Sequence, residues 1–243
     1  MMVRTHFEDT AKMTLNKAIL LYEGDGHSFA TIHNVVIEGK TKQSLGAGHP
    51  VDVEMLGTLI NALGRNVSIG GYLPPNILSV GFDSMVWWVK PSKRRVFFKT
   101  NEEIIGERSE VVPHPGLVFG VNGSGVWAVC AVKGNTRPTE DTPIWQAPYF
   151  NVWSSGNICT GTIETPKSVA VTETGKWEEC FFSSYFSHPN AHGSRQLINS
   201  RINPYQFWKT VLDGKYKTFP TQKLVQTNKT LKDFIKTING SDR

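Results

Sequence analysis

A series of closely spaced strand-like segments in the middle of the chain constrains the fold more than any other feature. Runs rich in β-branched and aromatic residues stand at 85–90, 95–100, 117–121 and 126–132. The last two are joined by the turn sequence Asn122-Gly123-Ser124-Gly125, which is typical of a β-hairpin. Because connections this short favour antiparallel neighbours, we expect a four-stranded antiparallel meander with one face free to take a helix.

Two aromatic pairs, Trp87-Trp88 and Phe97-Phe98, lie inside these strands. Successive residues of a strand point to opposite faces of its sheet, so each pair places one large ring on each face. Either both faces are covered by other elements, or one of them is a binding surface.

Helices are predicted on both sides of the meander in the chain, which gives an α+β fold class. Asp52 is the N-cap candidate for a helix that ends at Gly64, with apolar residues at helical spacing between them. Further helices are expected at 174–186, 204–212 and 230–238.

The first 50 residues are predicted to form an N-terminal extension to a main domain of residues 51–243. Apolar runs at 18–22 and 29–37 flank a glycine-rich turn, which predicts a β-hairpin within residues 15–38. This hairpin either extends the main sheet or forms a docking surface for a partner. The glycine-containing segment 45–50 is predicted to be a structural turn, because it lacks the Lys-Ser/Thr ending of a phosphate-binding loop. We therefore expect no cofactor there.

The composition is that of an ordinary globular protein, with 39% hydrophobic and 19% charged residues. No apolar run approaches the length of a membrane-spanning helix. The N-terminus lacks the basic-then-apolar order of a signal peptide, because Glu8 and Asp9 occur early. We therefore expect a cytoplasmic protein with no membrane partner.

The net charge of +5 arises largely from lysines late in the chain. A basic excess can bind nucleic acid or an acidic protein partner. Here the late lysines alternate with apolar residues, as on an amphipathic surface helix, so nucleic-acid binding is not expected. The cluster Lys93-Arg94-Arg95 is predicted to be a solvated hairpin turn.

The chain has three cysteines, Cys130, Cys159 and Cys180. Three thiols cannot all pair and none stands in a Cys-x-x-Cys spacing, so neither a disulfide framework nor a zinc site is expected. Cys130 lies in an apolar strand and Cys180 in an aromatic helix, which favours buried, inert thiols. Cys159 follows a glycine turn and has polar neighbours, and Asn151 stands eight positions upstream, where it can be folded back onto the thiol.

Several interpretations of Cys159 follow from its sequence context. It can be a reactive nucleophile, or a small buried hydrophobic residue like most free cysteines. A third interpretation is a cysteine hydrolase in which a histidine such as His188 serves as the base.

The motifs around Cys159, and the order of elements, resemble the ubiquitin-conjugating enzymes. The hallmark of that family is His-Pro-Asn, a short turn, Gly-x-Ile-Cys and then Leu-Asp. Here Gly156-Asn157-Ile158-Cys159 matches residue for residue, and Tyr149-Phe150-Asn151 replaces His-Pro-Asn with the same asparagine-to-cysteine spacing.

A wider set of segments is similar to a bacterial branch, the PRTRC (ParB-related, ThiF-related cassette) system protein B family, or prokaryotic ubiquitin-conjugating family D. The similarity covers about residues 17–212. The segments that carry it are 45–48, 88–94, 114–119, 147–152 and 182–190.

This resemblance implies a ubiquitin-conjugating-like fold and a cysteine thioester acyl transferase. Such an enzyme takes the C-terminal glycine of a ubiquitin-like protein from an activating enzyme onto its cysteine and passes it to an amine. Cys159 would be the nucleophile. The Asn151 carboxamide would donate a hydrogen bond to the oxyanion formed when the amine attacks, or would chiefly hold its loop in place.

The resemblance also implies partners. These are a ThiF-type activating enzyme, a small ubiquitin-like protein and a metal-dependent deconjugating peptidase from the same operon. Plasmid maintenance and phage defence are both compatible settings for such a system.

Two departures from the family pattern leave alternatives open. Thr160-Gly161 replaces Leu-Asp, so the acid that helps deprotonate an incoming lysine is absent from its usual place. Its candidate substitutes are Glu164, Asp141 and His188. Since the literal His188-Pro189-Asn190 follows both the cysteine and a helix, it is predicted to be a helix stop. The alternative function is a non-catalytic scaffold of the conjugating fold that binds a ubiquitin-like protein or its activating enzyme.

Overall fold

The computed structural model describes residues 15–24, 27–38, 42–52, 55–56, 59, 72–191 and 197–240. The chain divides into two compact units, Met1–Val67 and Ser68–Arg243. The predicted division at residues 50 and 51 into an extension and a main domain stays a prediction.

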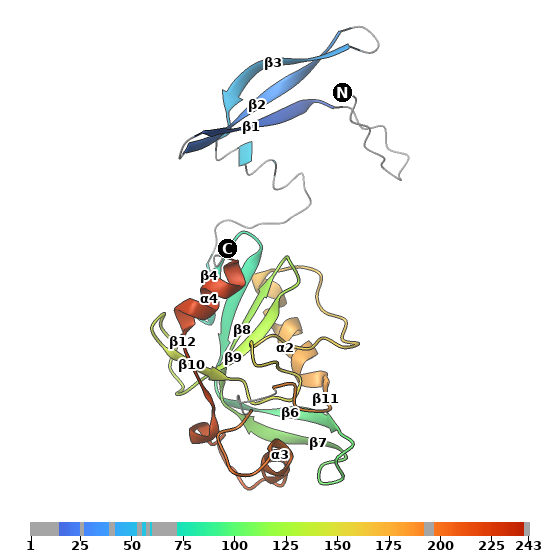
Figure 1. The fold of residues 1–243 in the computed structure, drawn as a ribbon, viewed down its shortest axis with the longest axis vertical. Coiled ribbons are helices and arrows are strands. Elements are labelled where there is room, and N and C mark those ends of the chain that lie inside the picture. The colour runs from blue at the N-terminus through green and yellow to red at the C-terminus, as the bar shows by residue number, and fades with distance from the viewer. Residues whose placement is uncertain are drawn as a thin grey trace. The chain divides into compact units, whose positions relative to one another are not determined.

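Three antiparallel strands form the sheet of the first unit, in the order β1-β2-β3. They are β1 (Lys17–Gly24), β2 (His27–Glu38) and β3 (Lys42–Pro50) (Figure 1). β1 and β2 confirm the predicted hairpin, and Tyr22 lies opposite Phe29 with the two rings stacked 4.5 Å apart between centroids. Stacked cross-strand pairs of this kind stabilise the register of a hairpin.

The prediction of a turn at residues 45–50 is wrong, because this segment belongs to β3. Its glycines allow a close cross-strand contact instead. Gly48 lies opposite His33, and a Cβ on Gly48 would collide with the His33 ring. The His33 Nδ1–H donates to the Gly46 carbonyl oxygen at 2.9 Å. A strand glycine here marks the close approach of a neighbouring side chain.

The helix predicted after Asp52 begins as expected. The Asp52 carboxylate accepts the backbone N–H of Met55 at 2.8 Å, and the Asp52 carbonyl accepts that of Leu56 at 3.0 Å. These two bonds are those of a helix N-cap. Most of the helix up to Gly64, and with it any packing against a sheet, lies outside the described residues.

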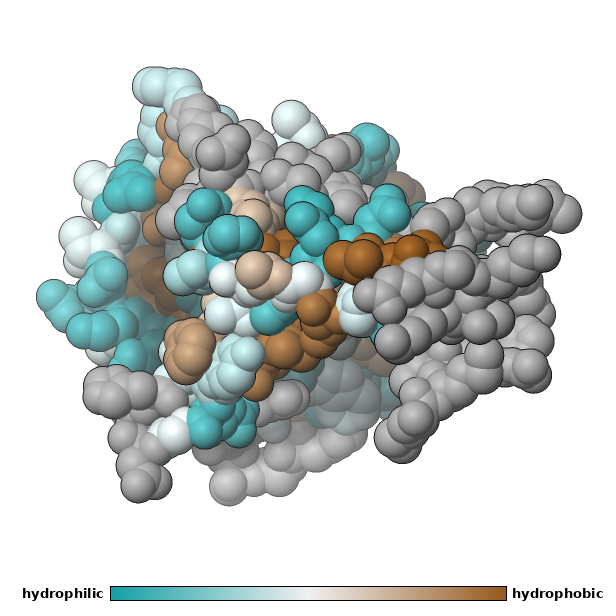
Figure 2. Space-filling model, turned by 90° about the horizontal axis from the view of Figure 1, so that it is seen from above, coloured by the Kyte–Doolittle hydropathy of each residue, from teal (hydrophilic) through white to brown (hydrophobic). Residues whose placement is uncertain are grey.

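Apolar side chains of the first sheet reach the surface. Leu21 is 77% and Phe29 61% exposed, whereas Ile32 is buried. Figure 2 shows hydrophobic residues at the surface of the described part of the chain, next to hydrophilic ones.

A six-stranded antiparallel sheet forms the centre of the second unit, in the order β12-β10-β9-β8-β5-β4. A smaller sheet has the order β11-β6-β7, in which β11 pairs with β6 in parallel. The strands of the large sheet are β4 (Ile77–Val80), β5 (Ser84–Val89), β8 (Gly116–Asn122), β9 (Trp127–Val132), β10 (Pro143–Gln146) and β12 (Gln226–Thr230). Those of the small sheet are β6 (Ser92–Lys99), β7 (Glu107–His114) and β11 (Tyr185–Phe186).

The predicted four-stranded meander is wrong in its pairing. Strands form at all predicted positions and the β8–β9 hairpin is confirmed, but β5 pairs with β8 and not with β6. β6 and β7 make a hairpin of their own between β5 and β8. The polar start of β7 and its Pro113 leave no apolar run, so the sequence pattern does not predict this strand. The cluster Lys93–Arg95, predicted as a turn, lies within β6.

The three later helices are confirmed. They are α2 (Thr174–Ser183), α3 (Pro204–Leu212) and α4 (Leu231–Asn239), and short 3₁₀ helices lie at η1 (Val171–Glu173) and η2 (Thr221–Lys223). α2 ends earlier than predicted because residues 185–186 form β11. α3 begins with Pro204 after Asn203, whose side chain accepts the N–H of Gln206 at 2.8 Å.

Both faces of the six-stranded sheet are covered by helices. Trp87 belongs to a buried cluster that includes residues of α2 and α3, and Trp88 belongs to a second cluster that includes α4. In Figure 1 α4 lies on one side of the sheet and α2 on the other. The second unit is therefore a mixed α and β structure with mostly antiparallel strands, as the predicted fold class requires.

Candidate active site

Asn151 and Cys159 are brought together by a short hairpin that follows β10. The Cys159 backbone N–H donates to the Asn151 carbonyl oxygen at 2.7 Å. Val152 and Ile158, one residue further in, form an antiparallel bridge. The asparagine is thus folded back onto the cysteine, as its position in the sequence predicted.

The turn of this hairpin requires its glycine. The Trp153 N–H donates to the Asn157 carbonyl at 2.9 Å, and the Gly156 N–H donates to the Trp153 carbonyl at 2.8 Å. Gly156 has a φ of +92°, a left-handed conformation that favours glycine. The Gly156 carbonyl then accepts the N–H of Val129 at 2.8 Å, which fastens the turn to β9.

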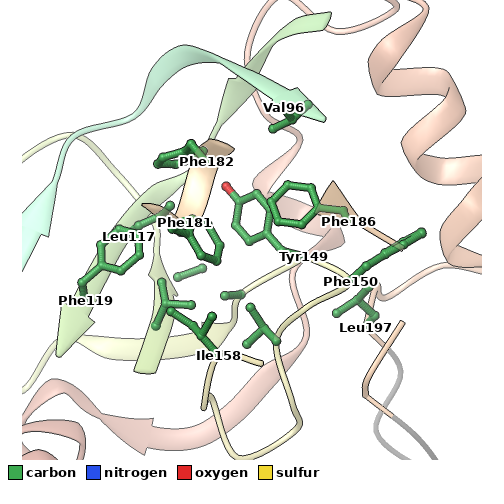
Figure 3. Close-up of a cluster of buried hydrophobic side chains, with 14 of the residues drawn as sticks. Val96, Leu117, Phe119, Tyr149, Phe150, Ile158, Phe181, Phe182, Phe186 and Leu197 are labelled. Atoms are coloured by element: carbon green, nitrogen blue, oxygen red, sulfur yellow. The ribbon is translucent and has the colours of Figure 1, made fainter. Parts of the chain in front are cut away.

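The hairpin is anchored by buried residues but leaves the cysteine accessible. Val152 and Ile158 are 0% and 6% exposed, while Cys159 is a partly exposed free thiol. Figure 3 shows Ile158 directed into the buried cluster that also contains Tyr149 and Phe150. A nucleophile at the edge of a rigid core can be reached by a large protein substrate while its backbone stays fixed.

The Asn151 side chain is held by Ser184, the C-cap residue of α2. The Ser184 hydroxyl donates its one proton to the Phe181 carbonyl at 2.7 Å, so it can only accept from Asn151 Nδ2, which lies 3.0 Å away. This fixes which end of the carboxamide carries the nitrogen. Since one Nδ2–H is bonded to α2, the contact supports the loop-holding role considered for Asn151.

The oxygen of the Asn151 carboxamide is a buried hydrogen-bond acceptor. Asn151 is 8% exposed, and its Oδ1 has no hydrogen-bond partner within the described residues. A buried acceptor without a partner costs about 1–3 kcal/mol. Because native proteins leave few such groups, each one suggests a functional or strained position.

A buried histidine–tyrosine pair holds the segment that leads into Asn151. Tyr149 OH and His114 Nδ1 are 2.7 Å apart, and His114 Nε2 lies 3.2 Å from the Arg94 carbonyl. A carbonyl only accepts, so Nε2 carries the hydrogen and the tyrosine hydroxyl donates to Nδ1. Burial lowers the pKa of His114 to about 4, so the ring is neutral, and burial also raises the pKa of Tyr149.

The candidate substitutes for the missing acid are placed differently. Asp141 stands in a turn whose flanking carbonyls, of Glu140 and Thr142, accept the first N–H groups of α4 at 2.9 Å. Glu164 is exposed, and its carbonyl accepts a hydrogen bond from Cys180 Sγ at 3.4 Å. Neither of these contacts involves the Asn151–Cys159 hairpin.

His188 lies on a segment that is fastened to this hairpin at two points. Ser184 bonds the Asn151 side chain, and the Asn190 N–H donates to the Phe150 carbonyl at 2.8 Å. His188 is exposed between these anchors, with Nδ1 3.0 Å from Ser187 Oγ.

The other two cysteines are less suited to nucleophilic chemistry. Cys130 is buried, and burial raises the pKa of its thiol. The pKa of Cys180 is raised by partial burial and by the nearby charge of Glu179. A raised pKa lowers the thiolate fraction, and the thiolate is the reactive form.

Ser184 and His114 were not selected as site residues from the sequence. Each belongs to a segment that carries the bacterial resemblance, 182–190 and 114–119. A polar residue within such a segment is the sequence signal that points to both of them.

The described residues contain no group of three or more His, Cys, Asp or Glu side chains able to hold a metal ion. Within that same part of the chain, no helix is both long and apolar enough to span a membrane.

Comparison with known proteins identifies a family for this chain. No curated protein and no solved structure matches the sequence. The family model of prokaryotic E2 family D matches residues 54–227, which include the Asn151–Cys159 hairpin and the Ser184 anchor. The chain therefore belongs to prokaryotic E2 family D, a family of bacterial ubiquitin-conjugating-like proteins.

Proposed function

We propose that this protein accepts a ubiquitin-like protein as a thioester on Cys159 and transfers it to an amine. The observation that carries the proposal is the 2.7 Å contact between the Cys159 N–H and the Asn151 carbonyl in a chain of an E2 family. That contact fixes the backbone of a partly exposed cysteine beside the backbone of Asn151, whose side chain is buried. A ThiF-type activating enzyme would deliver the ubiquitin-like protein.

The chemistry has two acyl-transfer steps. The Cys159 thiolate attacks the carbonyl carbon of the ubiquitin-like C-terminus, forms the C–S bond and releases the thiolate of the activating enzyme. An acceptor amine then attacks the same carbon, forms a C–N bond and releases Cys159. An N–H of Asn151 that stabilises the oxyanion of this second step would be worth about 10²–10³ in rate.

The second step also needs a base for the amine proton, and we assign this role to His188. Its segment is anchored to Asn151 through Ser184 and to Phe150 through Asn190, whereas Asp141 lies beside α4. Histidine is the side chain most often used as a general base near neutral pH.

A reconstituted thioester assay tests the proposal. The protein is mixed with the activating enzyme and ubiquitin-like protein of its own operon and ATP, and adducts are separated without reductant. Wild type and Cys180→Ser are expected to form a reductant-sensitive adduct, and Cys159→Ala none. Cys180 is the matched control because it is also a partly exposed free thiol. An adduct that survives Cys159→Ala would contradict the assignment.

The same assay separates the two steps. His188→Gln is expected to form the adduct normally but to slow its discharge onto free lysine by about 10²-fold or more. Glu164→Gln and Asp141→Asn should discharge like wild type, and a slower Glu164 or Asp141 variant would reassign the base.

Thr160-Gly161, in place of an acidic residue, favours the scaffold as the second candidate function. The scaffold function would be established if an activating enzyme loaded with the ubiquitin-like protein binds the wild-type protein but forms no adduct with it.

A further inference from the structure

Two pockets of the second unit are lined by neighbouring residues of the same two segments of the chain. Their volumes are about 580 and 400 Å³, within the range of ligand-binding pockets. Lys90, which follows β5, lines the larger pocket, and Lys93, near the start of β6, lines the smaller one. The loop after β9 contributes Arg137 to the larger pocket and Gly134 to the smaller. We call these two pockets together the basic groove.

The basic groove carries an excess of positive charge. Lys90 and Arg137 line its larger pocket, and Lys93 and Lys217 its smaller one. Glu178 is the one carboxylate among the described lining residues, and it is neutralised by Arg94, whose Nη1 donates to Oε2 at 2.8 Å. The local field therefore favours an anionic ligand.

The lysines of the groove are free to bind such a ligand. Lys90, Lys93 and Lys217 are exposed, and none has an ion-pair partner in the part of the chain that the structure describes. Arg137 is different, because Nε and Nη2 donate to the carbonyls of Pro75 and Ile77, both at 2.8 Å. Arg137 is therefore a fixed part of the wall of the larger pocket, and the three lysines supply the charges that can pair with a ligand.

A buried aromatic ring forms part of the wall of the larger pocket. Trp88 lines this pocket and is 4% exposed. Lys90 lies over the same ring, with Nζ 5.9 Å from the centroid. A ligand that carries carboxylates would pair with the lysines around this ring.

We propose that the basic groove binds an acidic, extended peptide segment of a partner protein. Glutamate or aspartate side chains of the peptide pair with Lys90, Lys93 and Lys217. Single-stranded nucleic acid fits less well, because base stacking needs exposed rings and the lining aromatics Trp88 and Phe219 are buried. This binding does not depend on the reactivity of Cys159.

Fluorescence anisotropy with a short labelled Glu-rich peptide tests the proposal on the full chain. Two triple variants that lower the net charge equally are compared with wild type, and circular dichroism verifies that each is folded. The groove variant is Lys90→Gln, Lys93→Gln, Lys217→Gln, and the control variant is Lys167→Gln, Lys232→Gln, Lys236→Gln.

The groove variant is expected to bind the peptide about tenfold more weakly than wild type, since an exposed ion pair typically contributes roughly two- to threefold. The control variant should stay within about twofold of wild type. Equal losses in the two variants would show long-range attraction without a site, and would overturn the proposal. So would the absence of peptide binding to wild type, or tighter binding of an oligothymidylate of equal charge at the same ionic strength.

Discussion

The Ser184 hydroxyl determines the orientation of the Asn151 carboxamide. Because this hydroxyl donates its proton to the Phe181 carbonyl, it can only accept from Asn151, so Nδ2 points toward the end of α2. The orientation of Asn151 in this chain therefore depends on Ser184, which lies outside the cysteine motif and 33 positions after Asn151.

Ser184→Ala tests this dependence. The substitution leaves Nδ2 buried without an acceptor, so we expect the free energy of unfolding to fall by about 1–3 kcal/mol. Discharge of the Cys159 thioester should slow by up to about 10²-fold, the loss typical of one misplaced oxyanion donor. Adduct formation should be unchanged.

Ser183→Ala is the matched control, since Ser183 is exposed and bonds only within α2, to the Glu179 carbonyl. If both variants discharge at the same rate, Ser184 has no part in positioning Asn151.

His114 makes the stability of the protein depend on pH. Its pKa is lowered from 6.5 to about 4 by burial, so between these values the unfolded chain binds more protons than the folded one. Stability from this group is therefore fully present above about pH 6.5 and is lost as the pH falls toward 4.

Urea unfolding of wild type and His114→Gln near pH 7 and near pH 5 measures this contribution. The contribution of His114 to the free energy of unfolding changes by about 3 kcal/mol between neutral and strongly acidic pH. Part of this stability should be lost between pH 7 and pH 5. His114→Gln should be less stable at neutral pH, because it loses the bond from Tyr149, but should change less with pH. An equal pH dependence in both proteins would contradict the buried neutral histidine.

At the scale of elements, the contact of α4 with β8 depends on the absence of a side chain at Gly120. A Cβ at this position would lie 2.5 Å from Ile238 Cγ1 and 3.1 Å from Phe234 Cε1. Both of these residues are in the buried face of α4. The glycine lets α4 pack directly against the backbone of β8. The distance between the helix and the sheet is therefore set by the missing side chain.

Gly120→Ala is expected to destabilise the protein by about 1–3 kcal/mol through overpacking. Combining it with Ile238→Ala should cost less than the sum of the two single changes, because the shorter side chain makes room. Gly175→Ala is the control: Gly175 lies in α2 with nothing near its Cβ position, so alanine should stabilise by up to about 1 kcal/mol. Chemical denaturation measures all four variants, and strict additivity would exclude the steric explanation.

At the scale of the whole molecule, the described core residues of the second unit form two buried clusters. Among the residues that the structure describes, the members of both clusters lie between Ile77 and Ile238. The family match nevertheless begins at residue 54, within the first unit.

We expect the fragment Ser68–Arg243 to fold alone, with a free energy of unfolding within about 0.5 kcal/mol of that of the same transition in the full chain. Thermal and urea unfolding of this fragment and of residues 51–243 are the measurements. A fragment that starts at residue 68 and is unfolded, beside a stable one that starts at 51, would show that the intervening helix belongs to the domain.

The amino-acid sequence by itself determined the features whose causes lie within a few residues. Asn203 and Pro204 start α3, the turn 122–125 joins β8 to β9, and Gly156 closes the hairpin that returns Asn151 to Cys159. The family motif and its spacing are equally local, and they lie within the residues that the family model matches.

Only the tertiary structure decided which distant segments meet. The pairing of β5 with β8, the hold of Ser184 on Asn151 and the His114–Tyr149 bond join segments separated by about 30 residues or more. Strand β12, Gln226–Thr230, lacks apolar residues and forms because β10 offers it backbone partners. Such contacts leave no local pattern in the sequence, because their energy comes from groups that are neighbours only after folding.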